Sequence, residues 1–364
     1  MNFFEIKKKD SKSRARLAVL HTSRGDVETP AFLPCGTKSL TGVVYAKEHK
    51  FWGARALQVS TLHHWLDPGD QTIKKAGGLH KVLDWDRAIF SDSGGGFLAE
   101  KLVPRLVDPR MRVSDVLLTE EGVTFRSGSD RTLKKLTPES SVQMQLNFGS
   151  DAIQTLLFVP PASKGDKQIS KALRICADWP ARARQQFAKA PLEVRKKTLL
   201  FATLGFSFGG KLSENSIRAN DAPGADGYAV CGIGQAVAKS EFSRRLRAMI
   251  GRLDRSKPLQ VSGLGDPKKI ILAIDCGADL IDSLTPYASA SLGRALAFAG
   301  QPGGYRVIEL SDARMQTVQE PLDRSCGCFT CLNHFQADLA VMFGKGDETY
   351  WRLLGLHNVK FYCP

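Results

Sequence analysis

The chain has 364 residues, of which 43% are hydrophobic and 24% are charged, a composition typical of a well-packed water-soluble protein rather than a disordered one. No run approaches the ~18 apolar residues of a membrane span, the first residues lack the apolar segment of a secretion signal, and the cysteines are too few for a disulfide scaffold. We therefore expect a cytosolic, cytoplasmic protein with no membrane partner. The net charge of +14 favours a polyanionic partner such as a nucleic acid.

Short apolar, β-branched runs recur along the chain and alternate with longer helix-like stretches. Eight of these runs are predicted strands, at 31–36, 56–60, 88–93, 152–158, 199–205, 227–232, 259–263 and 278–284. Their nearly continuous apolar character is typical of parallel strands that are covered on both faces. Eight such units predict an α/β fold, a (β/α)8 TIM barrel, and a doubly wound sheet is the structural alternative.

Two stretches interrupt this alternation. The runs 113–118 and 123–126 flank Glu120-Glu121-Gly122 and predict a β-hairpin within an insertion near 99–135. Thr137, Pro138 and Glu139 then form a typical helix start, with the threonine as N-cap. The second break is the tail. We expect a barrel over residues 1–308 and a C-terminal zinc-binding subdomain over residues 309–364.

Positive charge is concentrated in two segments. One spans 164–197, and the other, at 244–269, holds eight Lys and Arg residues against Asp254 and Asp266. A solvated basic helix face is the ordinary explanation of such a run. With an excess of this size, we favour binding to the phosphates of a nucleic acid.

Three cysteines in the tail, Cys326, Cys328 and Cys331, have the spacing C-x-C-x2-C. Three thiolates and one imidazole form a closed tetrahedral zinc site, which is structural rather than catalytic. His357 is the preferred fourth ligand, because a helix predicted over 350–356 would carry it at its end, and His334 and Cys363 are the alternatives. The sequence therefore predicts a structural Zn²⁺ that ties the tail to the barrel.

Two aspartates stand at predicted strand ends, where barrel enzymes place their chemistry. Asp92 lies in Ser91-Asp92-Ser93-Gly94-Gly95-Gly96, a loop that could also bind phosphate or be merely flexible. Asp279 and Asp282 lie on opposite faces of the eighth strand, so only Asp282 is expected to face the mouth, with helix capping as the alternative role. Two such carboxylates suit glycosyl transfer, in which one attacks an anomeric carbon and the other transfers protons.

Motifs along nearly the whole chain resemble those of the tRNA-guanine (queuine) transglycosylases. They lie at 29–34, 36–37, 66–69, 77–80, 91–95, 136–139, 149–151, 226–230 and 277–282, followed by the cysteine and histidine set. The resemblance implies a glycosyltransferase of the pentosyltransferase type that replaces guanine in tRNA by a 7-deazaguanine base. It also implies a homodimer or heterodimer.

The resemblance assigns roles to residues of this chain. Asp282 becomes the nucleophile at ribose C1′ and Asp92 the residue that transfers protons. The base-binding residues implied by the same alignment of motifs are Ser93, Gly94, Gly95, Cys231, Gly232 and Ile233.

Several positions depart from the family pattern. Leu157 stands where the family has a base-reading aspartate, Gly205 where it has a glutamine, and Gly96 where it has a stacking aromatic. Each lost buried hydrogen-bond partner costs about 1–3 kcal/mol, so guanine should bind poorly unless other groups compensate. The run 283–289 replaces the arginine-rich segment of bacterial members, and 286–298 is similar to the eukaryotic accessory subunit.

Three hypotheses follow from these observations. The first is an active transglycosylase with an altered base pocket, which we favour because Asp92 and Asp282 are both present. The second is a non-catalytic tRNA-binding subunit of a heterodimeric transglycosylase. The third is a relative that acts on DNA.

Overall fold

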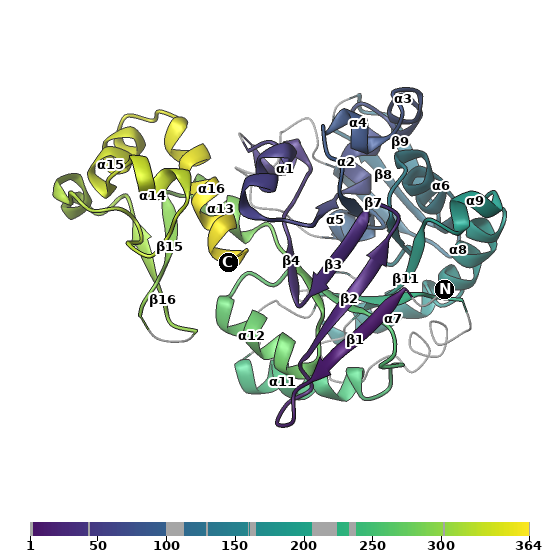
Figure 1. The fold of residues 1–364 in the computed structure, drawn as a ribbon. Coiled ribbons are helices and arrows are strands. Elements are labelled where there is room, and N and C mark those ends of the chain that lie inside the picture. The colour runs from purple at the N-terminus through teal and green to yellow at the C-terminus, as the bar shows by residue number, and fades with distance from the viewer. Residues whose placement is uncertain are drawn as a thin grey trace.

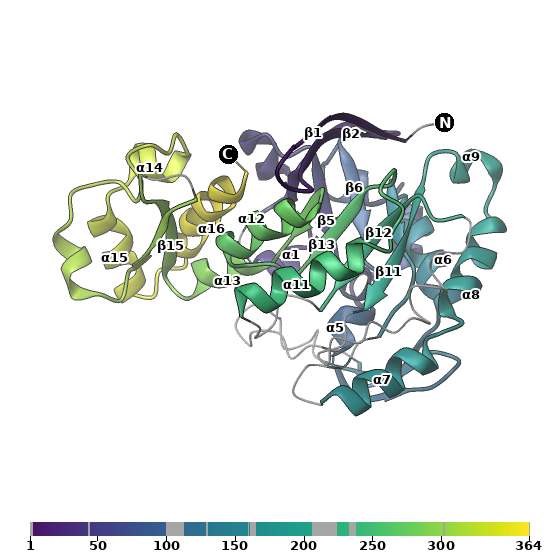
Figure 2. The same cartoon turned by 90° about the horizontal axis from the view of Figure 1, so that it is seen from below.

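The computed structural model describes residues 3–42, 44–99, 113–128, 130–158, 160, 165–205, 224–232, 238–300 and 303–363. Eight parallel strands form its central sheet (Figures 1 and 2), in the order β4–β14–β13–β12–β11–β10–β6–β5. These strands are β4 (Ala31–Leu33), β5 (Ala56–Val59), β6 (Ala88–Ser91), β10 (Ala152–Gln154), β11 (Leu199–Gly205), β12 (Gly227–Cys231), β13 (Leu259–Ser262) and β14 (Leu280–Asp282).

The sheet closes on itself. The first and last strands of this order meet at a parallel bridge between Cys35 and Gln58, where Gly36 N donates to Gln58 O at 2.8 Å. The last barrel strand, β14, pairs with the first, β4. The predicted barrel is therefore confirmed and the doubly wound alternative is wrong. All eight predicted strands are present, but several end earlier than predicted, because their last residues leave the sheet to form the rim.

Helices follow the strands. They are α1 (Lys38–Thr41), η1 (Ala46–Trp52), α2 (Thr61–Leu66), α3 (Asp70–Lys75), α4 (Leu79–Val82), α5 (Gly95–Ala99), α6 (Pro138–Phe148), α7 (Asp166–Ile175), α8 (Trp179–Ala188), α9 (Leu192–Arg195), α11 (Lys239–Ile250) and α12 (Pro267–Cys276). The predicted start of α6 is confirmed, since Thr137 Oγ1 accepts from Ser140 N at 3.2 Å with proline at the first position.

A three-stranded antiparallel sheet covers the bottom of the barrel. It consists of β1 (Phe4–Lys9), β2 (Arg16–Thr22) and β3 (Gly25–Thr29). Its buried Leu20 and Val27 belong to one core cluster with Ala88 and Leu280, the first residues of two barrel strands. Arg16 pairs with the buried Asp279 at 2.7 Å at this same end. The amino end of the barrel is thus closed, and the carboxyl end is left for a site.

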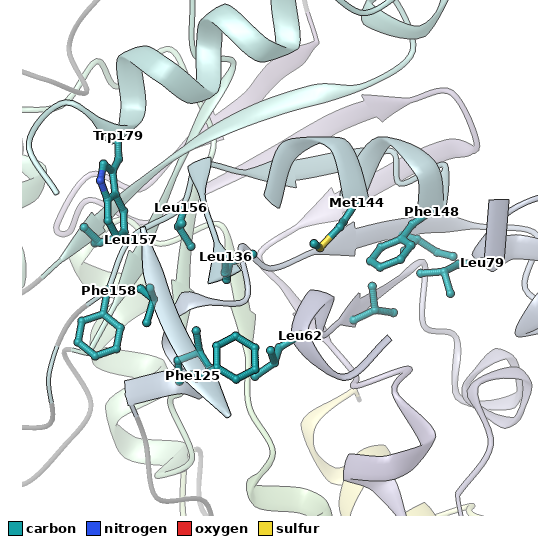
Figure 3. Packing of buried hydrophobic residues seen from close by; sticks show 14 of the residues in the cluster. Leu62, Leu79, Phe125, Leu136, Met144, Phe148, Leu156, Leu157, Phe158 and Trp179 are labelled. Carbon is teal, nitrogen blue, oxygen red and sulfur yellow. The ribbon is translucent and has the colours of Figure 1, made fainter. Parts of the chain in front are cut away.

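The insertion is a three-stranded antiparallel sheet of β7 (Val113–Leu118), β8 (Val123–Ser127) and β9 (Leu133–Leu136). The predicted hairpin is confirmed as β7 and β8. The third strand was missed, because Lys134 and Lys135 interrupt its apolar pattern. Figure 3 shows Phe125 and Leu136 of this sheet packed near Leu62 and Leu156, so the insertion extends the main core.

The part of the chain from Thr285 onward lies beside the barrel (Figure 1) and has a core around Leu339 and Leu354. It contains α13 (Thr285–Ser291), β15 (Arg294–Phe298), β16 (Tyr305–Glu309) and, in the predicted tail, η4 (Ala313–Thr317), α14 (Phe329–Asn333), α15 (Gln336–Gly344) and α16 (Thr349–Tyr362). The helix predicted to end near His357 continues to Tyr362, so this part of the prediction was wrong. The division of the chain at residues 308 and 309 stays a prediction.

Among the described residues, no helix combines the length and the apolar character that crossing a bilayer requires.

Candidate active site and metal centre

A cavity of about 280 Å³ lies at the carboxyl ends of the barrel strands. Residues that line it include Asp92, Ser93, Leu157, Thr203, Cys231 and Asp282. They lie near or just after the carboxyl ends of five different strands, β6, β10, β11, β12 and β14. Leu157 forms part of the wall and leaves the cavity open. The two carboxylates that were predicted to face a common mouth do so.

Asp92 directly follows β6 and is held by its neighbours. Its Oδ1 accepts hydrogen bonds from Gly94 N at 2.7 Å and from Thr61 N at 3.1 Å. The Thr61 hydroxyl donates to the Asp92 carbonyl oxygen. The Gly94 amide of the glycine-rich loop thus orients the Asp92 carboxylate.

The next glycine is required by packing. A Cβ on Gly95 would lie 2.0 Å from the Leu157 carbonyl oxygen, so no larger residue fits where this loop crosses the end of β10.

Asp282 is the last residue of β14. Its Oδ1 accepts from Gln260 Nε2 at 2.6 Å, and its backbone carbonyl oxygen accepts from Gly263 N at 2.8 Å. Asp279, three residues earlier, is buried at the opposite end of the strand with Arg16, as the alternation of strand side chains predicts. Asp282 is therefore bound by groups of the neighbouring strand β13 rather than capping a helix.

Burial raises the pKa of both carboxyl groups. The pKa of Asp92 rises to about 7, mainly through loss of hydration, with a further contribution from the charge of Asp282. The pKa of Asp282 rises to about 6 for the same main reason, while the hydrogen bonds from Gln260 and Ser262 lower it. Near neutral pH one group can be ionised while the other holds a proton, the arrangement that acid–base catalysis requires.

Three buried glutamines beneath the cavity were not predicted as functional residues. Gln58, Gln154 and Gln260 lie on β5, β10 and β13 and are hydrogen-bonded to one another. A signal was present in the sequence, because each is a polar residue inside a short apolar strand. A buried amide in such a place needs hydrogen-bond partners, which is a reason to look for a network.

The metal-binding cluster forms as predicted. The ligand atoms of Cys326, Cys328, Cys331 and His357 all lie within 4.8 Å of one another. His357 Nδ1 lies 3.2, 3.5 and 3.8 Å from the sulfurs of Cys331, Cys328 and Cys326. In a tetrahedral Cys3His zinc site adjacent ligand atoms are roughly 3.5–3.8 Å apart, so the four residues fit a closed, four-coordinate metal ion.

The orientation of His357 also fits metal binding. Its Nε2 lies 2.7 Å from the Leu296 carbonyl oxygen and can only donate there. The proton is therefore on Nε2, and the lone pair of Nδ1 faces the three thiols. The two alternative ligands lie elsewhere: His334 packs on the Phe329 ring, and Cys363 belongs to a separate hydrophobic cluster with Leu40 and Tyr287.

The predicted base-binding residues are only partly brought together. Ser93, Cys231 and Gly232 line the cavity, whereas Gly94 and Gly95 support its wall without lining it. Ile233 lies outside the described residues. Gly96 lines the cavity and Gly205 ends β11. The base-binding role of all these residues stays a prediction.

The chain is similar to known proteins along almost its whole length. Residues 10–363 match the family model described as queuine tRNA-ribosyltransferase. The chain belongs to this family. It is 33% identical over 369 residues to the queuine tRNA-ribosyltransferase of a Ruegeria species, a match that covers 99% of this chain and 89% of that protein. The corresponding protein of Methylacidiphilum infernorum is 30% identical over 99% of this chain and 92% of its own length.

A third relative, the queuine tRNA-ribosyltransferase of Shewanella sediminis, is 31% identical over 97% of this chain. Membership of the queuine tRNA-ribosyltransferase family makes the chain a transferase of the pentosyl-transferring type with a barrel fold and a Cys3His metal-binding site.

Proposed function

We propose that this chain replaces a guanine in tRNA by a 7-deazaguanine base through a covalent intermediate on Asp282. The observation that carries the proposal is that Asp92 and Asp282 line one cavity from opposite parts of the barrel rim. A sugar–base bond held between two carboxylates is the arrangement that a double displacement at an anomeric carbon requires.

The proposed first displacement begins with an ionised Asp282. Its carboxylate oxygen attacks ribose C1′, the C1′–N9 bond breaks, and the bonding electron pair leaves with guanine. Protonated Asp92 gives its proton to the departing base. In the second displacement the Asp92 carboxylate takes the N9 proton of the incoming base, whose nitrogen attacks C1′ and releases Asp282. The two inversions give net retention, and the strand stays attached to the enzyme between the steps.

The proposed nucleic-acid substrate is tRNA. The excess of 51 Lys and Arg over 37 Asp and Glu suits a phosphate backbone. Exposed Arg244, Arg247 and Lys268 lie on α11 and α12, on the outside of the barrel. Because the two carboxylates are enclosed in a cavity, the target nucleotide has to leave its stack to reach them.

The identity of the incoming base depends on groups that differ from the expected pattern. Leu157 offers the base no hydrogen bond, but Thr203, Ser93 and Gln154 also line the cavity and have polar side chains. These groups can compensate in part for the expected aspartate and glutamine. We infer a pocket that selects its base by shape and by neutral hydrogen-bonding groups rather than by a carboxylate.

We further infer that the metal is zinc. Cys326, Cys328, Cys331 and His357 would hold it, and a closed four-coordinate site supplies structural stabilisation rather than Lewis-acid chemistry. The ion would link the segment around Cys326 to α16 and, through the Leu296 carbonyl, to β15.

A non-catalytic tRNA-binding subunit is the second candidate, because Leu157 and Gly205 replace base-reading residues and 286–298 is similar to the eukaryotic accessory subunit. The two candidates separate when the purified chain alone is incubated with bulk tRNA and labelled guanine or 7-deazaguanine. Incorporation that disappears in Asp282→Asn supports the enzyme. Tight tRNA binding without incorporation supports the subunit. Duplex DNA that competes with tRNA on equal terms at the same salt concentration would favour a DNA substrate instead.

A further inference from the structure

Three glutamines form a hydrogen-bonded layer across the inside of the barrel. Gln154 Nε2 donates to Gln260 Oε1 at 3.1 Å, and Gln260 Nε2 donates to Gln58 Oε1 at 2.9 Å. The same Gln260 Nε2 donates to Asp282 Oδ1 at 2.6 Å. The relative exposures of Gln58, Gln154 and Gln260 are 8%, 3% and 0%; Gln58 and Gln154 also line the cavity, whereas Gln260 lies beneath them without access to water.

The neighbours of Gln260 fix the orientation of its amide. Its oxygen accepts from Gln154, and its two N–H groups are used by Gln58 and Asp282. A flipped amide would place its oxygen against the Asp282 oxygen and its N–H group against the Gln154 donor. The contact with an ionised Asp282 would be repulsive, so the carboxylate favours the orientation in which Gln260 donates to it.

The backbone of Gln154 is fixed in turn from outside the barrel. Gln145 on α6 accepts from Gln154 N at 2.8 Å and donates to Gln154 O at 2.9 Å. The chain of contacts therefore runs from a helix on the barrel surface, through two inward-facing amides, to the carboxylate at the mouth. An apolar residue at position 260 would fill the same space and would need no hydrogen-bond partners. Packing alone therefore does not explain why a glutamine stands at this buried position.

We propose that Gln260 is a positioning residue for Asp282, holding its carboxylate in one orientation toward the cavity, with Gln154 and Gln58 fixing the direction of the Gln260 amide. The inference rests on the proposed role of Asp282 as nucleophile. A short hydrogen bond from a neutral donor to a carboxylate stabilises the ionised form, which is the form that attacks. The other titratable groups that face Asp282 are Asp92 across the mouth and the Cys35 thiol at the end of β4.

The test uses Gln260→Met, which keeps the length of the side chain and removes its donor. Selective labelling of aspartate carboxyl carbons lets NMR follow the titration of Asp282 in the free protein, with Asp282→Asn assigning the signal and the Asp92 signal followed alongside. The expected result is an upward shift of the Asp282 titration by about one pH unit or more. In parallel, the rate of covalent adduct formation with tRNA at pH 7 should fall roughly 10- to 100-fold at saturating tRNA, with little change in KM.

Gln336→Met is the matched control. Gln336 is also a buried glutamine whose side chain donates a hydrogen bond, to the Pro321 carbonyl oxygen at 2.9 Å, but it begins α15 and does not line the cavity. This variant should lose stability and keep the Asp282 titration within 0.3 pH units of the wild type, roughly the scatter of such measurements. Gln154→Met removes the side chain that donates to Gln260 and should shift the Asp282 titration in the same direction by a smaller amount. If Gln260→Met does not fold, Gln154→Met is measured in its place.

An unchanged Asp282 titration and a wild-type adduct rate in Gln260→Met would overturn the inference and leave the proposed function standing. A wild-type chain that forms no adduct would instead remove the proposed function. The NMR titration would then still decide whether Gln260 acts on Asp282, because it needs no substrate.

Discussion

The carboxylates of Asp92 and Asp282 enter one cavity from β6 and β14, and the negative charge of Asp282 raises the pKa of Asp92. Around the closed sheet these strands are separated by β4 and β5, so the two groups face each other across the mouth rather than along one edge. Burial contributes most to the raised pKa of each carboxyl group, and the proposed catalysis depends on the difference between the two pKa values.

The rate of adduct formation should depend on pH in a bell-shaped manner. Asp282 must be ionised to attack, so its pKa of about 6 sets the limb on which the rate rises with pH. Asp92 must be protonated to give its proton to the leaving base, so its pKa of about 7 sets the limb on which the rate falls. Single-turnover rates across pH 5–9 measure both limbs. In Asp92→Asn the falling limb should disappear together with most of the activity. A rate that keeps rising up to pH 9 in the wild type would contradict these roles.

Asp282→Asn should stabilise the fold at alkaline pH. The pKa of Asp282 is raised from 3.8 to about 6, so between these values the folded chain keeps a proton that the unfolded chain has lost. The free energy of unfolding therefore falls as pH rises through this window, and the loss is complete above it. At pH 8 the asparagine variant should be more stable by roughly 1–3 kcal/mol, while at pH 4 the two proteins should differ little.

Urea denaturation at the two pH values measures this difference. Asparagine keeps an oxygen that can accept from Gln260, so the hydrogen bond is retained in the comparison. If Asp282→Asn lowered the free energy of unfolding equally at both pH values, the result would show that burial of the ionised Asp282 carboxylate does not destabilise the fold.

Loss of the metal should unfold the tail before the barrel. Cys328 is fully buried, and its sulfur also accepts from Cys331 N at 3.4 Å. Cys328→Ser should lose the bound ion and at least ~3 kcal/mol of stability, because the binding free energy of a structural metal is folding free energy. Elemental analysis should find about one zinc per wild-type chain and none in the variant. His334→Ala and Cys363→Ser should both retain the metal; loss of metal in either of them would mean that the ligand set is wrong.

Leu157 should limit the affinity for guanine. It lines the cavity and is nearly buried, so a base edge against it keeps unsatisfied hydrogen-bonding groups. Leu157→Asn supplies a donor and an acceptor on a smaller side chain with the same branching at Cγ and should tighten guanine binding about tenfold, a change of ~1.4 kcal/mol. Leu157→Val is the control for the lost volume. Equilibrium dialysis with labelled guanine measures both, and equal affinities would place base recognition elsewhere in the cavity.

Sequence patterns predicted the parts of the structure that are determined by residues close together in the chain. The barrel strands, the Thr137 cap and the cysteine cluster each follow from residues that are neighbours in the chain. The sequence did not predict the full length of α16. Its last turns depend on Val359 and Phe361, whose burial against other parts of the fold cannot be read from the local sequence.

The glutamine layer was missed for a different reason. Gln58, Gln154 and Gln260 lie on three separate strands, and only barrel closure brings their amides into contact. Each residue alone could have been a partly exposed strand position. Their common function depends on register between strands, which no local pattern determines.

The most direct test of the central claim is to trap the covalent intermediate. The chain is incubated with tRNA in the absence of an incoming base, denatured, and separated on a gel, and the linked peptide is identified by mass spectrometry. The account predicts a protein–tRNA adduct joined through the peptide that contains Asp282, formed by the wild type and absent from Asp282→Asn. An adduct of equal yield in Asp282→Asn, or linkage through another residue, would contradict it.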